Sequence, residues 1–519
     1  MRLSQSSRCQ FSTQKQNGDG GGLPGALQLG CDSPSMATGS VIKGSSVLIA
    51  GRVAGMAGSF LLFLLLTWRS TEVVGMFRVA VTYFTMMDFL PLLGMHRWVA
   101  AEIAHRVDQQ HALFEVACSF AVGVAVFCAA AYFAVASLGF YGSEASGCLR
   151  LVALTTVASA INLCSLSALV GLGYSHEAGL LSFLETLIRS SLAILLVVLG
   201  ANLSSVMLVF LGARYAIAAI GYVLVRSHVA GTSRSIGQPL LTAFLTQVPN
   251  LALSAVGFLA IRNAAILLLP LLRSESAAGL YAAPFQLFDM VLMVPTVLTI
   301  STNYIFVESS RQSVTALRRS TNQLIDITAL FVLPMAVLGF VLARPIIETL
   351  FGIAYSASIP PLRVLLASAV VVSLDQILAL GMAVSGHYQA DRTCMVLGAC
   401  SAVAVTCLLS GSWGATGAAV GFLVGVTCTL SLRLRLMRWL IHVPSLAQTT
   451  QGPSIAAAVA GIAVWAALRG FGGNGHMAPS FAVLLAAAGS VLYCLVLYWR
   501  GGLTGERLMQ AQAFMARRR

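Results

Sequence analysis

Apolar segments long enough to cross a lipid bilayer recur along most of the chain. A bilayer-spanning helix needs about 20 mostly apolar residues, and we predict fourteen such segments, at about 45–67, 74–95, 113–138, 150–173, 178–199, 204–225, 245–271, 278–306, 324–343, 362–386, 391–410, 414–440, 453–468 and 478–499. Only 9% of the 519 residues are charged, whereas soluble domains carry about 25%. The sequence therefore predicts an all-α polytopic membrane protein and excludes a soluble enzyme, a nucleic-acid-binding protein and a secreted disulfide module.

Basic residues are distributed unevenly between the loops on the two sides of the predicted helices. With the N-terminus in the cytoplasm, 20 of the 31 lysines and arginines fall on the cytoplasmic side, six fall outside and five lie within helices. Cytoplasmic loops collect such residues, so both termini are predicted to be cytoplasmic. The polar segment 1–42 is predicted to be a disordered cytoplasmic tail, in which Met36 is a second candidate start, and 500–519 a basic cytoplasmic tail.

An internal repeat divides the predicted helices into two halves. A shift of 204 residues places Arg69 on Arg273 and Gly75 on Gly279. The same shift aligns Phe84 with Phe288, Met86 with Met290 and Pro91 with Pro295. Six helices separate the two copies, which therefore run in the same direction across the membrane. We expect two parallel six-helix lobes followed by two more helices, at 43–228, 240–441 and 453–499.

Charged residues inside the predicted helices are few and therefore informative. A charge at membrane depth costs several kcal/mol unless it is paired or hydrated, so such residues are functional candidates. We interpret the five arginines as candidate substrate-binding residues: Arg52, Arg78, Arg189, Arg214 and Arg262. The acids are Asp88, Glu185, Asp289, Asp326 and Asp375, of which Asp88, Asp289 and Asp375 are candidate ion-coupling residues. The first lobe is thus internally basic and the second internally acidic.

Arginine is well suited to binding phosphate. Its planar guanidinium donates paired hydrogen bonds and stays charged at physiological pH, so an arginine-lined cavity predicts an anionic substrate. Purely structural roles for these charges stay open at this point. Arg78 and Asp326 can reach water from near the ends of their helices, and Glu185 can pair with Arg189 on one helix face. The remaining charges can form structural pairs between helices.

Motifs for soluble catalysis and for metal binding are missing from the sequence. It holds no GxxxxGK[ST] phosphate-binding loop, no GxSxG or HExxH motif, and no cysteine–histidine cluster with zinc spacing. We therefore predict no cofactor, no metal and no enzymatic activity. The connections between the predicted helices are also too short to hold an extramembrane catalytic domain. These features favour a membrane transporter.

Several short motifs occur in an order that is typical of one transporter family. Lys43-Gly44 precedes the first helix, Gly75-Met76-Phe77 opens the second, and Asp88, Gly94, Glu102 and Arg106 follow; Arg262-Asn263, 278–283, 350–355 and 414–419 complete the pattern. Over residues 43 to about 440 the chain resembles Wzx-type polysaccharide flippases of the multidrug, oligosaccharidyl-lipid and polysaccharide (MOP) exporter superfamily. One departure is Asn263, because an acid often follows the basic position of this helix in relatives.

The resemblance implies a flippase of the bacterial cytoplasmic (inner) membrane. Its cargo would be polyprenyl-diphosphate-linked oligosaccharide repeat units for exopolysaccharide, capsule or O-antigen biosynthesis, moved by alternating access between the two lobes. It also implies lipid-linked oligosaccharide and membrane lipids as partners, with polysaccharide polymerase and export machinery as further ones. Two alternatives stay open: an integral-membrane polysaccharide polymerase or ligase, for which the outer loops are short, and a small-molecule exporter of the same architecture.

Overall fold

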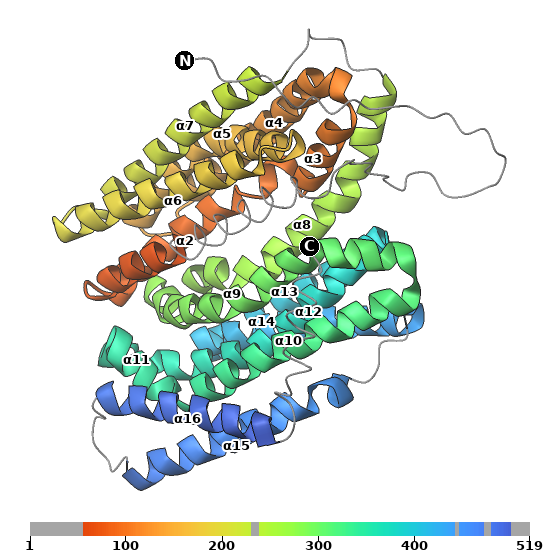
Figure 1. Cartoon of the computed structure of the whole chain (residues 1–519). Coiled ribbons are helices and arrows are strands. Elements are labelled where there is room, and N and C mark those ends of the chain that lie inside the picture. The colour runs from red at the N-terminus through yellow and green to blue at the C-terminus, as the bar shows by residue number, and fades with distance from the viewer. Residues whose placement is uncertain (1–54, 230–237, 442–445, 472–478, 500–519) are drawn as a thin grey trace, which may run out of the picture.

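The computed structural model describes residues 55–229, 238–441, 446–471 and 479–499, and within these ranges the chain forms helices and short connections with no β-strand. Thirteen of the described helices are long and apolar enough to cross a membrane, and Gly55–Thr67 is a shorter apolar helix at the start of the described chain. The predicted all-α polytopic membrane fold is confirmed (Figure 1). The predicted tails 1–42 and 500–519, and the candidate Arg52, lie outside the described residues.

The helices of the first half form one bundle around a central helix (Figure 1). Besides helix Gly55–Thr67, this bundle contains α2 (Thr71–Met86), η1 (Leu90–Leu92), α3 (His96–His105), η2 (Val107–Gln109), α4 (Gln110–Ser137), α5 (Ser143–Gly171), α6 (Ser175–Val198) and α7 (Leu203–His228). The central helix is α5, which packs against α2, α3, α4 and α7. Small buried residues such as Thr156, Ser159 and Ser165 on α5 allow this close approach from several sides.

The second half forms a second bundle, with the two C-terminal helices on its far side (Figure 1). Its elements are α8 (Gln238–Leu272), α9 (Glu275–Gln312), α10 (Val314–Val341), α11 (Ala343–Phe351), η3 (Ile353–Ser358), α12 (Ile359–Val384), α13 (Tyr388–Trp413) and α14 (Ala415–Ile441). Helices α15 (Leu446–Phe471) and α16 (Pro479–Trp499) pack against α10, away from the first bundle. Two lobes followed by two added helices are the arrangement that the sequence repeat predicts.

One helix is shorter than the apolar run that contains it. The sequence predicts a continuous helix over 74–95, but α2 ends at Met86. Pro91 lacks a backbone N–H and its ring clashes with the preceding turn of a helix, so the chain turns instead, and Leu93 takes a left-handed conformation with φ 47°. As a result Asp88 lies beyond the end of α2 with its side chain 42% exposed, and not within a helix as the sequence predicts.

The two bundles meet where α2 crosses α9, and this crossing follows the sequence repeat. A Cβ atom on Gly75 would collide with the carbonyl oxygen of Glu275, and one on Gly279 would collide with that of Thr71. The two helices also begin in the same way, because Ser70 and Ser274 each accept a 3.2 Å hydrogen bond from the backbone N–H three residues later. We call this part of the molecule the Arg69 end.

Candidate functional site

We call the contact of α2 with α9 at Gly75 and Gly279 the glycine crossing. A cavity of about 360 Å³ lies between the two bundles next to this crossing. Helix Gly55–Thr67, α2, α6 and α7 line it from the first bundle, and α9 lines it from the second. Its polar lining residues are Ser59, Arg78, Thr85, Thr186, Arg189, Ser190, Gln286 and Asp289. Arg78 follows Gly75 by three residues, so the crossing lies within one helical turn of the cavity wall. We take this central cavity as the candidate functional site.

Asp289 brings two of the predicted arginines together at the wall of the central cavity. Its Oδ1 atom accepts a 2.8 Å hydrogen bond from Arg262 on α8, and its Oδ2 atom lies 3.5 Å from Arg78 on α2. Arg78 also donates a 3.1 Å hydrogen bond to the side chain of Gln286. Both guanidinium groups lie against the ring of Phe285, at 5.2 and 5.4 Å from its centroid. We call Asp289, Arg78 and Arg262 the Asp289 triad.

A second charged cluster occupies the first-bundle side of the cavity. Arg214 on α7 forms ion pairs with Asp88 at 2.7 Å and with Glu185 at 2.8 Å. Glu185 also lies 3.7 Å from Arg189, one turn along α6, and accepts a 3.1 Å hydrogen bond from Asn162 on α5. The predicted pairing along the face of α6 is thus present. It forms part of a four-charge cluster that joins three helices and the turn after α2.

Aromatic rings hold the two arginines of this cluster in place. Arg189 lies over the rings of Phe84 and Phe210, at 5.2 and 4.9 Å from their centroids, and Arg214 lies 4.4 Å from that of Phe84. The attraction between a cation and an aromatic face compensates part of the cost of removing the charge from water. Arg214 is only 3% exposed and does not line the cavity, whereas Arg189 does. The structure therefore presents Arg78 and Arg189 to the cavity directly, with Arg262 behind Asp289.

The two clusters differ in their charge balance. In the first-bundle cluster two arginines face two carboxylates, so the charges cancel. In the Asp289 triad two arginines share one carboxylate, which leaves one positive charge without a described counter-charge. Because the uncompensated charge belongs to arginine at the wall of a cavity, the arrangement is suited to an anionic ligand.

The predicted ion-coupling carboxylates all have arginine partners. Asp88 pairs with Arg214, Asp289 with Arg262, and Asp375 with Arg433. An arginine partner neutralises a carboxylate without a bound ion, so these contacts favour the structural inter-helix pairs that the sequence left open. Asp375 does not line the central cavity. Within the described ranges no group of three or more His, Cys, Asp and Glu residues is placed to hold a metal ion.

Arg433 is a buried charge that the sequence does not single out. Its position near the end of its helix predicts an arginine on the cytoplasmic side, and within the protein it is fully buried and bonds both Asp375 and Asp391. Position along the helix therefore does not indicate that this charge is buried. Helical register is the signal that finds it, because Arg433 shares a face with the buried residues Thr429 and Met437 at steps of four.

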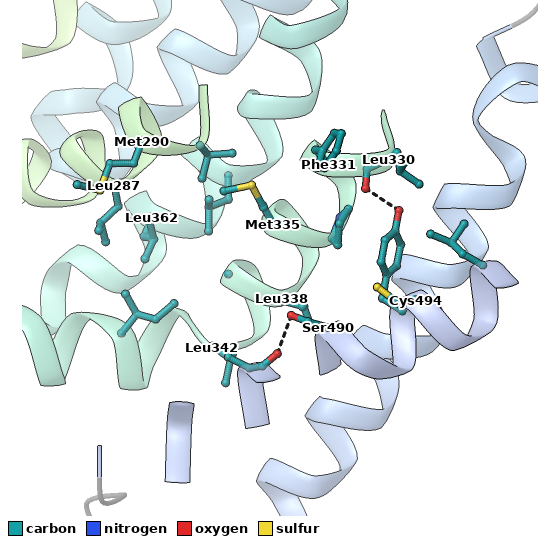
Figure 2. Close-up of a pocket in the computed structure, with 18 residues that line it drawn as sticks. Leu287, Met290, Leu330, Phe331, Met335, Leu338, Leu342, Leu362, Ser490 and Cys494 are labelled. Atoms are coloured by element: carbon teal, nitrogen blue, oxygen red, sulfur yellow. Dashed lines mark hydrogen bonds between the residues drawn. The ribbon is translucent and has the colours of Figure 1, made fainter. Parts of the chain in front are cut away.

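A second, larger cavity of about 700 Å³ lies on the opposite side of α9. It is bounded by α9, α10, α11, α12 and α16, and Figure 2 shows that aliphatic, sulfur-containing and aromatic side chains such as Met290, Phe331 and Met335 line it. None of its lining residues is charged. The hydroxyl of Tyr493 on α16 donates a 2.8 Å hydrogen bond to the carbonyl of Leu330 and so ties α16 to α10 at this site. We call this the apolar pocket.

Helix α9 is therefore the shared wall of two cavities of opposite character. Gln286 and Asp289 line the polar central cavity, whereas Leu287, Met290 and Val291 line the apolar pocket. The steps of three and four residues along a helix put these two sets on different faces. No pattern in the sequence indicates the apolar pocket, because apolar residues facing a cavity and apolar residues facing lipid look the same.

Comparison with proteins of known structure finds the same fold in membrane transporters. The lipid II flippase MurJ in an inward closed conformation superposes with a TM-score of 0.63 over 88% of this chain and 99% of its own, at 11% identity. A MOP superfamily transporter from Pyrococcus furiosus gives 0.56 over 78% and 96%, at 16% identity. A multidrug resistance MATE family transporter in an inward-facing conformation gives 0.54 over 76% and 96%, at 14% identity.

Comparison at the level of sequence gives one family and no individual relative. No curated protein matches the chain. Residues 71–360 match the family described as polysaccharide biosynthesis protein. The match covers more than half of the chain and includes the Asp289 triad and the glycine crossing. It establishes that the chain belongs to the polysaccharide biosynthesis protein family, with a fold similar to that of MOP superfamily transporters.

Proposed function

We propose that the chain flips polyprenyl-diphosphate-linked oligosaccharide repeat units across the bacterial cytoplasmic membrane for polysaccharide biosynthesis. Both termini are cytoplasmic in this proposal, and the two bundles give the cavity access to each side in turn. A polysaccharide polymerase and export machinery would receive the flipped units. The membership of a polysaccharide biosynthesis family and the transporter fold support the general activity, and the chemistry of the two cavities supports the lipid-linked cargo.

The observation that carries the proposal is the pair of cavities on the two sides of α9. A lipid-linked glycan has a charged diphosphate, a polar saccharide and a long hydrocarbon chain. The central cavity offers arginine and hydroxyl groups, and the apolar pocket offers about 700 Å³ without a charged lining residue. In our proposal the diphosphate binds in the central cavity and the lipid chain passes around α9, so that its more distant part enters the apolar pocket. A cargo that is only polar or only apolar would match one of the two cavities and leave the other unoccupied.

The arginines would bind the diphosphate through their fixed charge and forked geometry. Arg78 and Arg189 line the cavity, and Arg262 lies next to it through Asp289. Guanidinium groups donate paired hydrogen bonds to phosphate oxygens, which an ammonium group cannot reproduce. The apolar surroundings strengthen these contacts relative to water. Arg52 is retained as a further candidate from the sequence alone.

The experiment is a flipping assay in proteoliposomes that hold the full-length protein. A fluorescent polyprenyl-diphosphate disaccharide is incorporated, and its transfer between leaflets is followed by chemical quenching of the outer leaflet. Each hydrogen bond to a charged group is worth roughly 1.5–3 kcal/mol, so Arg78→Ala should weaken apparent affinity for the probe by about tenfold or more. Arg78→Lys should restore only part of the loss. Arg363→Ala is the matched control, because Arg363 is exposed and lies outside both cavities.

Three further outcomes of this assay identify the alternatives. Transfer of a lipid-free amphipathic dye without transfer of the diphosphate lipid would indicate a small-molecule exporter. Lengthening of the saccharide on the probe would indicate a polymerase or ligase. Equal transfer by wild type, Arg78→Ala and protein-free vesicles would contradict the proposed function itself.

A further inference from the structure

We propose that Asp289 is a resident counter-anion, which occupies the arginine site in the empty protein and gives up Arg78 to the diphosphate of the cargo. This inference rests on the proposed function and adds a role that the sequence did not assign to Asp289. The carboxylate lies at the cavity wall between two guanidinium groups, which is the position that a bound phosphate oxygen would take. The exchange of one anion for another would couple binding of the cargo to movement of the bundles.

The two contacts of Asp289 are unequal in a way that suits such an exchange. Its contact with Arg262, at 2.8 Å, stays within the second bundle, whereas its contact with Arg78, at 3.5 Å, crosses to the first bundle. The shorter contact is the stronger hydrogen bond, and the longer one lies at the limit of hydrogen bonding. When the contact with Arg78 breaks, Asp289 therefore keeps its shorter hydrogen bond, which is to Arg262. The carboxylate does not become an unpaired buried charge, so the exchange avoids the largest electrostatic penalty.

Arg78 has hydrogen-bonding capacity that its described neighbours do not use. Its two terminal nitrogens contact Gln286 and Asp289, while its Nε atom is buried without a hydrogen-bond partner. A guanidinium group carries five N–H donors, and a buried donor without an acceptor is unfavourable. A diphosphate brings several acceptor oxygens, whereas Asp289 offers one oxygen at long range. Arg78 thus gains more from the cargo than from the carboxylate it releases.

The contact of Arg78 with α9 is also one of few polar links between the bundles near the cavity. Other described links lie at the Arg69 end, where the hydroxyls of Thr71 and Ser276 are 2.9 Å apart and the backbone N–H of Gly142 donates a 2.7 Å hydrogen bond to Glu275. When Arg78 binds the cargo, its contacts with α9 at the cavity break. The hydrogen bonds that join the two bundles at the Arg69 end remain. We call the Arg78–Asp289 ion pair the latch, because it links the two bundles at the cavity until an anion of sufficient charge displaces the carboxylate.

This role predicts how anion binding responds when the carboxylate loses its charge. A phosphate monoester carries about −1.5 to −2 charges at pH 7 and a free diphosphate carries more, so either anion can compete with the single charge of Asp289 for Arg78. The separation of Arg78 from Asp289 opposes the binding of both anions. Removal of the charge of Asp289 should therefore tighten the binding of both, whereas loss of an ion-coupling residue would leave anion binding unchanged.

The test measures binding of farnesyl diphosphate and farnesyl monophosphate to the purified full-length protein in detergent by titration calorimetry. In Asp289→Asn we expect both probes to bind about tenfold more tightly, as expected for removal of one charge-assisted competitor. Asp289→Asn combined with Arg262→Gln keeps the net charge of the triad and should also bind both probes more tightly than wild type, which separates removal of the competitor from a mere gain of positive charge. Glu308→Gln, on α9 but outside both cavities, is the matched control.

The possible results separate this inference from the proposed function. If wild type binds neither probe, the proposed function fails and the inference fails with it. If wild type binds the diphosphate and neither variant binds the two probes more tightly, the function stands and the proposed role of Asp289 is wrong. Unchanged binding with loss of flipping in Asp289→Asn would also overturn the latch, and would assign Asp289 to ion coupling.

Discussion

At the scale of single residues, Arg433 shows how a charge can be structural inside this protein. It is the largest fully buried side chain among the described residues and bonds to two carboxylates, Asp375 on α12 and Asp391 on α13. Ser254 on α8 also lies 3.4 Å from Asp391. One side chain therefore joins three helices and contacts a fourth through Asp391. In a lipid-facing protein, where apolar burial distinguishes helix partners poorly, such a cluster selects which helices pack together.

We predict that Arg433→Met destabilises the second bundle. The change leaves Asp375 and Asp391 without their buried counter-charge, which typically costs about 3–5 kcal/mol. A thermal unfolding assay of the detergent-solubilised protein should show a clearly lower midpoint. Adding Asp375→Leu should restore part of the loss, since an unpaired buried charge is worse than none.

The control for this prediction is Arg435→Met, because Arg435 lies two residues along α14 and is exposed. It should leave the midpoint near that of wild type. An Arg433→Met protein as stable as wild type would show that the two carboxylates find new partners.

At the scale of helices, the close crossing of α2 and α9 depends on two glycines, Gly75 and Gly279, which have no side chain. Gly75 and Gly279 each lie against the backbone of the other helix one turn back, so the helices approach at the same point of each sequence copy. Arg69 and Arg273 then each bond backbone carbonyls at the end of a neighbouring helix, those of Val197 and Ala201 in one bundle and of Ser412 in the other. The repeated motif thus packs the two bundles closely together at the Arg69 end.

We predict that Gly75→Ala opens this crossing. The added methyl group would collide with backbone, which cannot move aside as a flexible side chain can, and such overpacking costs typically about 1–3 kcal/mol. In a cysteine-free background, the pair Thr71→Cys and Ser276→Cys should form a disulfide under oxidation, because the two hydroxyl oxygens are 2.9 Å apart. Adding Gly75→Ala should reduce the disulfide yield severalfold.

Gly147→Ala provides the comparison for this experiment, since a Cβ atom there meets no other atom within 4 Å. It should leave the yield unchanged. A yield in Gly75→Ala equal to that in the glycine parent would mean that the close crossing does not hold this end shut.

At the scale of the whole molecule, two bundles share one interface and the lipid-facing surface covers the rest. Large apolar side chains such as Phe127, Leu408 and Ile462 are 76%, 78% and 66% exposed, which suits a surface solvated by hydrocarbon and not by water. The long helix α9 belongs to the second bundle but lines the interface, so any relative movement of the two bundles would involve it. Its two ends must lie on opposite sides of the membrane.

We predict that a reporter inserted after Arg273 lies outside the cytoplasm and that one inserted after Ser313 lies inside. The positive-inside rule sets this orientation, and α9 connects the two positions across the membrane. Alkaline phosphatase and green fluorescent protein fusions at each site measure it. The reverse pattern would overturn the predicted orientation, although the parallel relation of the two bundles would stand.

The sequence by itself determined the fold class, the approximate positions of the membrane helices and the repeat, because apolar runs and the motif around Gly75 are local properties of the chain. It also found all three charged residues that line the central cavity, since any charge within an apolar run is conspicuous. Only the tertiary structure decided how these charges pair: Asp289 with Arg262 and Arg78, Arg214 with Glu185, and the buried Arg433 with Asp375. Pairing between helices depends on their rotation and register, which packing sets and no local pattern records. For the same reason only the folded protein separates the apolar pocket from the lipid-facing surface.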